Sequence, residues 1–236
     1  MVVELGEDGP IHIHIAEQMR EVEDCLGWSG QRPIEWLMDH ADVDRRWCLI
    51  HATHATPDEI RRMAESGAVA GLCPVTEANL GDGTFAAPDF IGQGGAFGIG
   101  TDSNVLIGVG DELRQLEYSQ RLARQIRNVV TGAASVSTGR ILFDHALSGG
   151  SQALGIAEVG LMEGASADIV ALDHDNAALV ARAGDAVLDS LIFAARRSPI
   201  DAVWVRGQRL VSDGRHHAAE PIAHRFHATM QRLLRA

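Results

Sequence analysis

The sequence predicts an α/β protein in which a parallel, barrel-type arrangement of βα units is followed by a small β module. Short apolar runs alternate with amphipathic helical stretches along the first part of the chain, which is the pattern of βα units. Polar residues gather where these runs end, and a (β/α)8 barrel carries its chemistry at the carboxyl ends of its strands. We therefore expect a barrel domain over residues 1–156 and a small β module with a C-terminal helix over residues 157–236.

Each expected element has its own signal in the sequence. Four apolar runs predict the parallel strands: Ile11–Ile15, Trp47–His51, Ala68–Cys73 and Ala96–Thr101. Amphipathic patterns predict helices over Ala16–Leu26, Pro33–His40, Pro57–Glu65 and Asp111–Val129. The third helix has the clearest start, because Thr56 suits the N-cap, Pro57 the first helical position and Glu59 a capping box. In the module, we expect a strand over 167–172, two strands around a glycine turn within 203–211, and a helix over 220–234.

Composition and charge exclude several classes of protein. With 236 residues, of which 46% are apolar and 22% charged, the chain is long enough to bury one substantial core. Its formal charge of −12 disfavours nucleic acid and anionic membranes as partners. No apolar run approaches the ~18 residues of a membrane helix, and the N-terminus lacks a secretory signal pattern. Three widely spaced cysteines indicate no disulfide framework, so we expect a cytoplasmic protein.

The segment from Ile11 to Glu17 (Ile-His-Ile-His-Ile-Ala-Glu) is the most informative part of the chain. Alternate side chains of a strand share a face, so His12 and His14 point one way and the isoleucines point the other. His14 is thereby placed at a strand end as a candidate metal ligand. Glu17 follows it within about one helical turn, where a carboxylate suits general acid and base work.

Two further residues complete the candidate site. Asp102 follows the fourth strand and offers a carboxylate, which with the imidazole of His14 makes a donor set that zinc prefers. His51 ends the second strand and is a candidate to hydrogen-bond the attacking water or the developing tetrahedral centre. Asp102 is also a candidate to accept a proton from the water and share the base role with Glu17. Each residue has a structural alternative as well, since Glu17 suits a first helical turn and Asp102 suits a turn after glycine.

Together these motifs resemble the amidohydrolase superfamily. They are His-x-Ala-Glu at 14–17, the strand-end His51, and Gly-Thr-Asp-Ser-Asn at Gly100 to Asn104. In that superfamily such residues lie on barrel strands five, six and eight. The segments 72–83 and 111–118 are similar to those of one family within it, the formimidoylglutamate deiminases of histidine degradation, whereas nucleobase and chlorotriazine deaminases tend to have Pro-x-Ser-Asn in place of 74–77.

The resemblance implies zinc-dependent hydrolysis of N-formimino-L-glutamate to N-formyl-L-glutamate and ammonia. It implies that His14 and Asp102 are ligands of one Zn²⁺ and that Glu17 is the proton shuttle. His51 matches the residue that contacts the reacting formimino group.

The resemblance also implies that the chain is the C-terminal half of a (β/α)8 barrel of the metal-dependent hydrolase kind. The family's first strand carries a second His-x-His pair of zinc ligands, and the only such pair here belongs to strand five. A complete barrel takes ~250 residues, whereas residues 1–156 alone precede the β module. A half barrel leaves open sheet edges that favour association, for example as a homodimer. The alternatives are another deaminase of the superfamily, of the guanine or cytosine type, and a catalytically inert half barrel.

Overall fold

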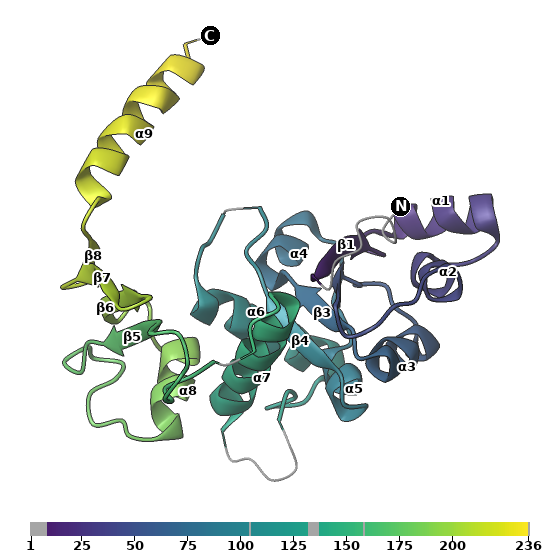
Figure 1. The fold of residues 1–236 in the computed structure, drawn as a ribbon, viewed down its shortest axis with the longest axis horizontal. Helices are drawn as coiled ribbons and strands as arrows, with labels where there is room; N and C mark the ends of the chain where they lie inside the picture. The colour runs from purple at the N-terminus through teal and green to yellow at the C-terminus, as the bar shows by residue number, and fades with distance from the viewer. Residues whose placement is uncertain (1–8, 104, 132–136, 158, 236) are drawn as a thin grey trace. The chain divides into compact units, whose positions relative to one another are not determined.

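The computed structural model describes residues 9–103, 105–131, 137–157 and 159–235 (Figure 1). In chain order, the helices and strands are β1 (Ile11–Ile15), α1 (Met19–Ser29), α2 (Pro33–His40), β2 (Trp47–His51), α3 (Pro57–Ser66), β3 (Val69–Leu72), α4 (Pro74–Leu80), α5 (Ala87–Gly92), β4 (Ala96–Ile99), α6 (Val109–Arg124), α7 (Thr138–Ala153), β5 (Ile169–Leu172), α8 (Asp185–Phe193), β6 (Ile200–Val205), β7 (Gln208–Ser212), β8 (Arg215–His216) and α9 (Ala219–Leu233). Two compact units result. One comprises Met1–Ala157 with Ala183–Phe193, and the other comprises Glu158–Arg182 with Ala194–Ala236.

The first unit contains a four-stranded sheet in the order β1-β2-β3-β4, and every neighbouring pair is parallel. This confirms the predicted βα pattern, with the four strands at the four apolar runs. Ile15 is opposite His51 in the register, so the ends of β1 and β2 are level. Parallel pairing therefore brings the residues after each strand to one edge of the sheet.

One face of this sheet is packed against helices. Leu49, Leu72 and Phe97 of the strands are fully buried and lie in one cluster with Ile60 and Met63 of α3. The capping box predicted for α3 is present, because Thr56 accepts a hydrogen bond from the backbone of Glu59 and the Glu59 carboxylate accepts one in return. The capping box therefore fixes the N-terminus of α3, the helix that packs on this part of the core.

Helix α7 packs against the edge strand β4 and was not predicted. A side chain at Gly149 would place its Cβ 2.1 Å from the carbonyl oxygen of Phe97, so only glycine allows the two backbones to approach this closely. At the end of α7, the carbonyl of Ala153 accepts a hydrogen bond from Nε2 of His12, 2.7 Å away. Ala153 also packs with Cys48 and Val69, which alternate with the core residues and so face the other side of the sheet.

Helix α8 is a correction to the predicted domain division. The sequence analysis placed its residues in the β module, but they pack in the first unit against α6 and α7. The Asp189 carboxylate accepts a hydrogen bond from the backbone of Gly139, and Arg114 donates one to the carbonyl of Ile192. Burial of Ile192 in the main core explains why the helix belongs to this unit.

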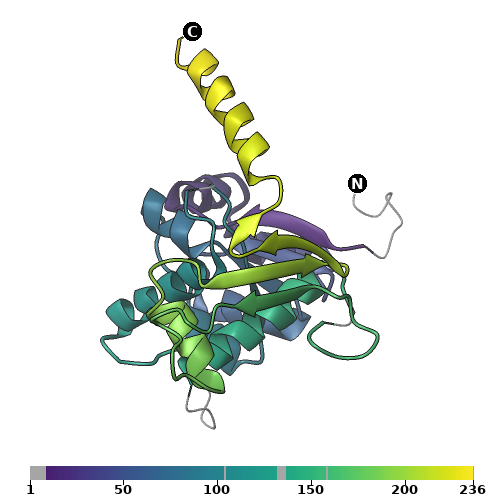
Figure 2. The same cartoon turned by 90° about the vertical axis from the view of Figure 1, so that its left-hand side faces the viewer.

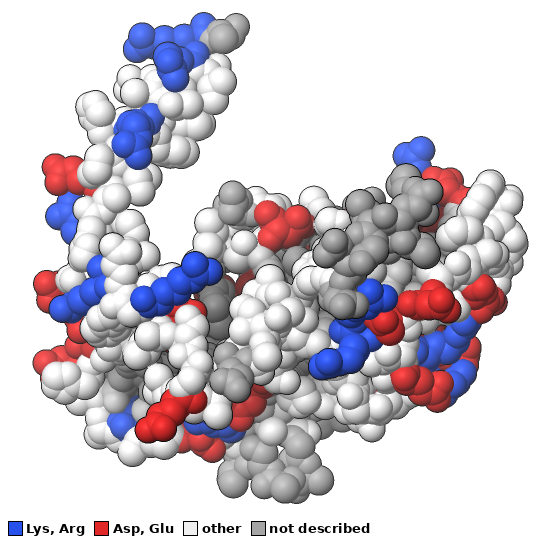
Figure 3. All heavy atoms as spheres, in the orientation of Figure 1, with Lys and Arg blue, Asp and Glu red and all other residues white. Residues whose placement is uncertain are grey.

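The second unit contains an antiparallel sheet in the order β5-β6-β7-β8, whose strands lie side by side in Figure 2. The expected pair of strands within 203–211 is present, with Arg206 and Gly207 in the turn between β6 and β7. Helix α9 matches the expected C-terminal helix and has no buried residue. Among the described residues, no helix is both long and apolar enough to cross a bilayer. Acidic and basic side chains are interspersed on the face shown in Figure 3.

Candidate active site at the strand ends

The loops that follow β1 and β2 are joined by backbone hydrogen bonds. The amide of Ala52 donates to the carbonyl of Ile15 (3.0 Å), and the amide of His54 donates to the carbonyl of Ala16 (3.1 Å). These bonds keep the segment that carries Glu17 beside the end of β2. Glu17 and His51, which are far apart in the sequence, are thus placed at one edge of the sheet.

Glu17 lies in the loop before α1, because this helix begins at Met19 and not at Ala16 as predicted. The carboxylate of Glu21 accepts hydrogen bonds from the backbone amides of Ala16 (2.8 Å) and Glu17 (2.9 Å). The helix does not extend back to Ala16, because the φ of this residue is 49°, outside the right-handed helical region. Glu17 is outside the first helical turn, so the structural alternative of a helix-dipole residue does not apply to it.

Four residues at the strand ends adopt a left-handed backbone conformation that residues other than glycine rarely take. Their φ values are 49° for Ala16, 66° for His51, 47° for Ala52 and 45° for Asp102. Such conformations cost of order 1–3 kcal/mol each and concentrate at functional sites. The strain therefore marks this edge of the sheet as a candidate site on grounds independent of the motifs.

His51 is the centre of the cluster and is fully buried. Its Nδ1 lies 3.2 Å from Oε1 of Glu77, and its Nε2 lies 3.7 Å from Oε1 of Glu17. The ring centroids of His14 and His51 are 5.5 Å apart. Nε2 is buried without a hydrogen-bond partner, and such an atom calls for a water or a ligand group. The predicted proximity of His14, Glu17 and His51 is thus present.

The charges around His51 determine whether its pKa is shifted above or below the ordinary value. Burial of the ring lowers the pKa, but the hydrogen bond to Glu77 and the negative charges of Glu17, Glu77 and Asp102 together raise it above the ordinary 6.5. Carboxylates near both ring nitrogens therefore favour the imidazolium form more than solvent does.

Asp102 follows β4 on an exposed loop that is attached to α4. The hydroxyl of Thr76 donates to the carbonyl of Thr101 (3.0 Å), and the amide of Ser103 donates back to the hydroxyl of Thr76 (3.1 Å). Asp102 is close enough for its charge to act on both His51 and Cys73. Asn104, the last residue of the motif here, lies outside the described residues.

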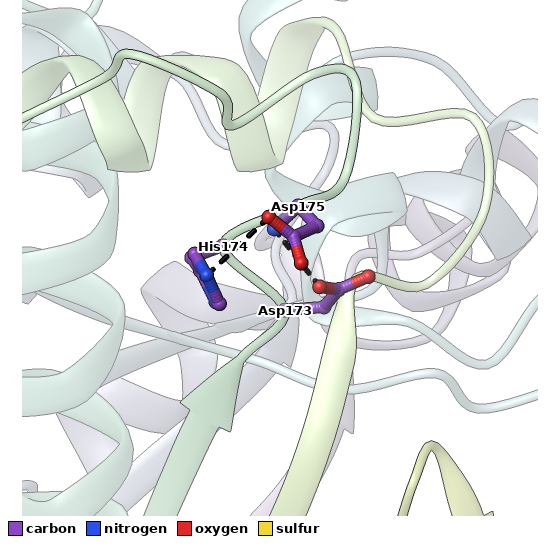
Figure 4. Close-up of side chains that lie close together, drawn as sticks. All are labelled: Asp173, His174 and Asp175. Atoms are coloured by element: carbon purple, nitrogen blue, oxygen red, sulfur yellow. Dashed lines mark hydrogen bonds and ion pairs between the residues drawn. The ribbon is translucent and has the colours of Figure 1, made fainter.

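The donor atoms of His14 and Asp102 fit a zinc ion chemically, and the orphaned Nε2 of His51 lies beside His14. Two protein ligands are fewer than a zinc site normally uses, so a metal held here needs donors from outside the described residues. Within the described ranges, one group of three potential ligand atoms lies within 4.8 Å of one another, and it belongs to the second unit. It consists of Asp173, His174 and Asp175 on an exposed turn (Figure 4), where exposed acidic groups are common without any ion.

Two residues close to the motifs make structural contacts, and one residue of the cluster was not predicted. Arg20 pairs with Asp24 in solvent, and the carbonyl of His54 accepts a hydrogen bond from Arg32, which ties that loop to α2. The sequence analysis gave no role to Glu77, which holds Nδ1 of His51. Its signal is Pro74 at the first position of a helix with a carboxylate three residues later.

Comparison with known proteins gives the family context of this site. Residues 6–210 match the amidohydrolase family. Formimidoylglutamate deiminase from Pseudomonas aeruginosa is 50% identical over 228 residues, which are 97% of this chain and 50% of that protein. A crystal structure of an amidohydrolase from Brucella melitensis is 57% identical with a TM-score of 0.93, covering 99% of this chain and 51% of that one.

A more distant structure is that of a zinc-bound adenosine deaminase from Xanthomonas campestris. It is 25% identical with a TM-score of 0.83, and the match covers 98% of this chain and 52% of that one. The chain therefore spans about half the length of these relatives. Together with the four parallel strands, this confirms the predicted half of a barrel joined to a β module.

Proposed function

This chain belongs to the amidohydrolase family, and from that premise we propose that it carries one half of the active site of a formimidoylglutamate deiminase. The proposed reaction is the hydrolysis of N-formimino-L-glutamate to N-formyl-L-glutamate and ammonia. The observation that carries the proposal is the cluster at the strand ends, in which Glu17 and Glu77 flank a buried His51 beside His14. The choice of substrate is supported by 50% identity to the P. aeruginosa enzyme over 97% of the chain.

His14 and Asp102 are the residues of this chain that would hold a zinc ion, with further ligands from the rest of the barrel. A zinc ion there would act as a Lewis acid that makes hydroxide available from water near neutral pH. The zinc-bound adenosine deaminase, which covers the chain at 25% identity, supports this choice of metal.

Glu17 is proposed to move the proton. It takes a proton from the attacking water as oxygen bonds to the formimino carbon, and it then delivers that proton to the nitrogen of the same group. This leaves a tetrahedral carbon that bears a hydroxyl and an amino group. Glu17 then passes the second proton of the water from the hydroxyl group to the same nitrogen, the C–N bond breaks, ammonia leaves, and the carbon retains the oxygen as a formyl group. The loop position of Glu17 leaves its side chain free for this exchange, since the backbone amides around it are already bonded to Glu21.

His51 and Asp102 are proposed to act on the reacting group. Nε2 of His51, which has no partner in the cluster, would accept a hydrogen bond from an N–H of the formimino group. The carboxylate of Asp102 would accept a hydrogen bond from the attacking water and share the base role. The three free cysteines are compatible with a reducing compartment, and we place the protein in the cytoplasm.

The alternatives are a deaminase of the nucleobase or nucleoside type and an inert half barrel. One experiment separates all three. The chain is co-expressed with the part of the P. aeruginosa enzyme that it does not cover, and ammonia release is measured from N-formimino-L-glutamate, adenosine, guanine and cytosine. Release from N-formimino-L-glutamate alone supports the proposal. Release from a nucleobase or nucleoside alone, or from none of the four, refutes it.

The proton shuttle is tested in the same assembly. Glu17→Gln should lower kcat by roughly 10²–10⁴-fold, the usual contribution of a positioned acid or base. Glu23→Gln, which alters an exposed carboxylate of α1, is the matched control and should leave the rate unchanged. Equal activity of the two variants would exclude Glu17 as the shuttle.

A further inference from the structure

We propose that Glu77 is a positioning residue that fixes the tautomer of His51. It holds the proton on Nδ1 and leaves Nε2 as the atom that meets the reacting group. The significance of this for catalysis rests on the proposed function. The tautomer itself is a property of the folded chain and is measured without substrate.

Hydrogen bonds to the backbone of Cys73 hold the carboxylate of Glu77 in place independently of His51. Its Oε1 accepts a hydrogen bond from the backbone amide of Cys73, 2.9 Å away, and its own amide donates to the carbonyl of Cys73, also 2.9 Å away. Cys73 is the N-cap of α4, so its amide has no partner within the helix and is left for the side chain. Glu77 is buried and its side chain is 6% exposed, which limits competition from water for the same oxygen.

The partners of the imidazole then determine where its proton lies. A carboxylate oxygen only accepts hydrogen bonds, so Nδ1 must donate to Oε1 of Glu77 across 3.2 Å. A neutral imidazole carries one N–H, and the bond made by one nitrogen fixes the state of the other. Nε2 is therefore the free acceptor, and it faces Glu17 at 3.7 Å, beyond hydrogen-bond length.

The same geometry predicts what happens when Glu77 is removed. Without an acceptor at Nδ1, the nearest carboxylate to the ring is that of Glu17 beside Nε2. The proton is then expected to move to Nε2, which would block the atom that the mechanism needs as an acceptor. Glu77 thus acts on catalysis only through His51.

The test is ¹⁵N NMR of the whole 236-residue chain with ¹⁵N-labelled histidine, at an alkaline pH where the ring is neutral. The His51 signals are assigned by their loss in His51→Gln. The wild type should show a protonated Nδ1, and Glu77→Leu should shift the proton to Nε2. Glu112→Leu is the matched control, because Glu112 is equally buried and bonds the amide of Val75 in the same helix start without touching His51. It should retain the wild-type tautomer.

Glu77→Gln covers the case in which Glu77→Leu does not fold. Glutamine keeps an acceptor oxygen for Cys73 and His51 but loses the charge, so the Nδ1–H proton resonance should move upfield as the bond weakens. The proposal is overturned if Nδ1 is unprotonated in the wild type, if Glu77→Leu keeps the wild-type tautomer, or if Glu77→Gln leaves the proton resonance unmoved. Absence of ammonia release with the expected tautomer would refute the proposed function and leave the role of Glu77 intact.

Discussion

Replacing Glu112 with glutamine is expected to remove a pH dependence of stability from this protein. Glu112 is 1% exposed, and burial raises the pKa of its carboxyl group from 4.5 to about 7. One oxygen accepts a hydrogen bond from the amide of Val75, but the other is buried without a partner. The folded state therefore favours the neutral acid.

The sign and the size of the effect follow from linkage. Because the folded pKa lies above the unfolded one, the stabilising contribution is fully present below pH 4.5 and is lost as the pH rises through about 7. A pKa difference of about 2.5 at 1.36 kcal/mol per unit gives ~3 kcal/mol between the two ends of this range. Glutamine cannot ionise, so the free energy of unfolding of Glu112→Gln should lack this decline.

Urea denaturation between pH 4 and pH 8 provides the measurement, followed by tryptophan fluorescence of the first unit, which contains Trp28, Trp36 and Trp47. The difference in unfolding free energy between wild type and variant should change by ~3 kcal/mol across the range. Glu23→Gln, at an exposed site of α1, should show a constant difference. A constant difference for Glu112→Gln as well would refute the reasoning.

Three further predictions concern packing, capping and burial. Gly149→Ala should lower Tm, because the added Cβ would lie 2.1 Å from the carbonyl oxygen of Phe97. Gly150→Ala is the control and should not lower Tm, because an added Cβ there would have no atom within 4 Å. Equal Tm values for the two variants would contradict the close contact between α7 and β4. Thr56→Ala should lower the free energy of unfolding by ~1 kcal/mol through loss of the α3 cap, and no loss in urea denaturation would exclude that role. Phe97→Ala should destabilise by ~3–5 kcal/mol, and a loss below 1 kcal/mol would exclude a packed core at β4.

The strands and α3 could be predicted because their signals are local. Apolar runs of five or six residues mark β1 to β4, and the Thr56 capping box marks one helix start. Helix α7 has a local start at the N-cap Ser137, but Gly139, Gly149 and Gly150 weaken its helical pattern, and its packing depends on Gly149 meeting a carbonyl on a distant strand. The start of α1 was misplaced because Ala16 adopts a left-handed backbone conformation with a φ of 49°, which the amphipathic pattern does not reveal.

In the candidate site, too, the residues with a local sequence signal could be predicted and a contact between distant segments could not. Strand periodicity was sufficient to place His14 and His51 at strand ends, and the structure brings them together with Glu17. The role of Glu77 was missed because Pro74 with a carboxylate three residues later marks a helix start but does not specify that this carboxylate reaches His51 on another strand.

Zinc content tests the central claim most directly, namely that the groups at the strand ends form half of one metal-dependent site. The chain is assembled with the complementary part of the P. aeruginosa enzyme, and bound zinc is measured by atomic spectroscopy after gel filtration. We predict close to one zinc per assembly for the wild type and for His12→Ala, whose imidazole instead bonds Ala153. His14→Ala should lose the metal. Full zinc content in His14→Ala would contradict the account.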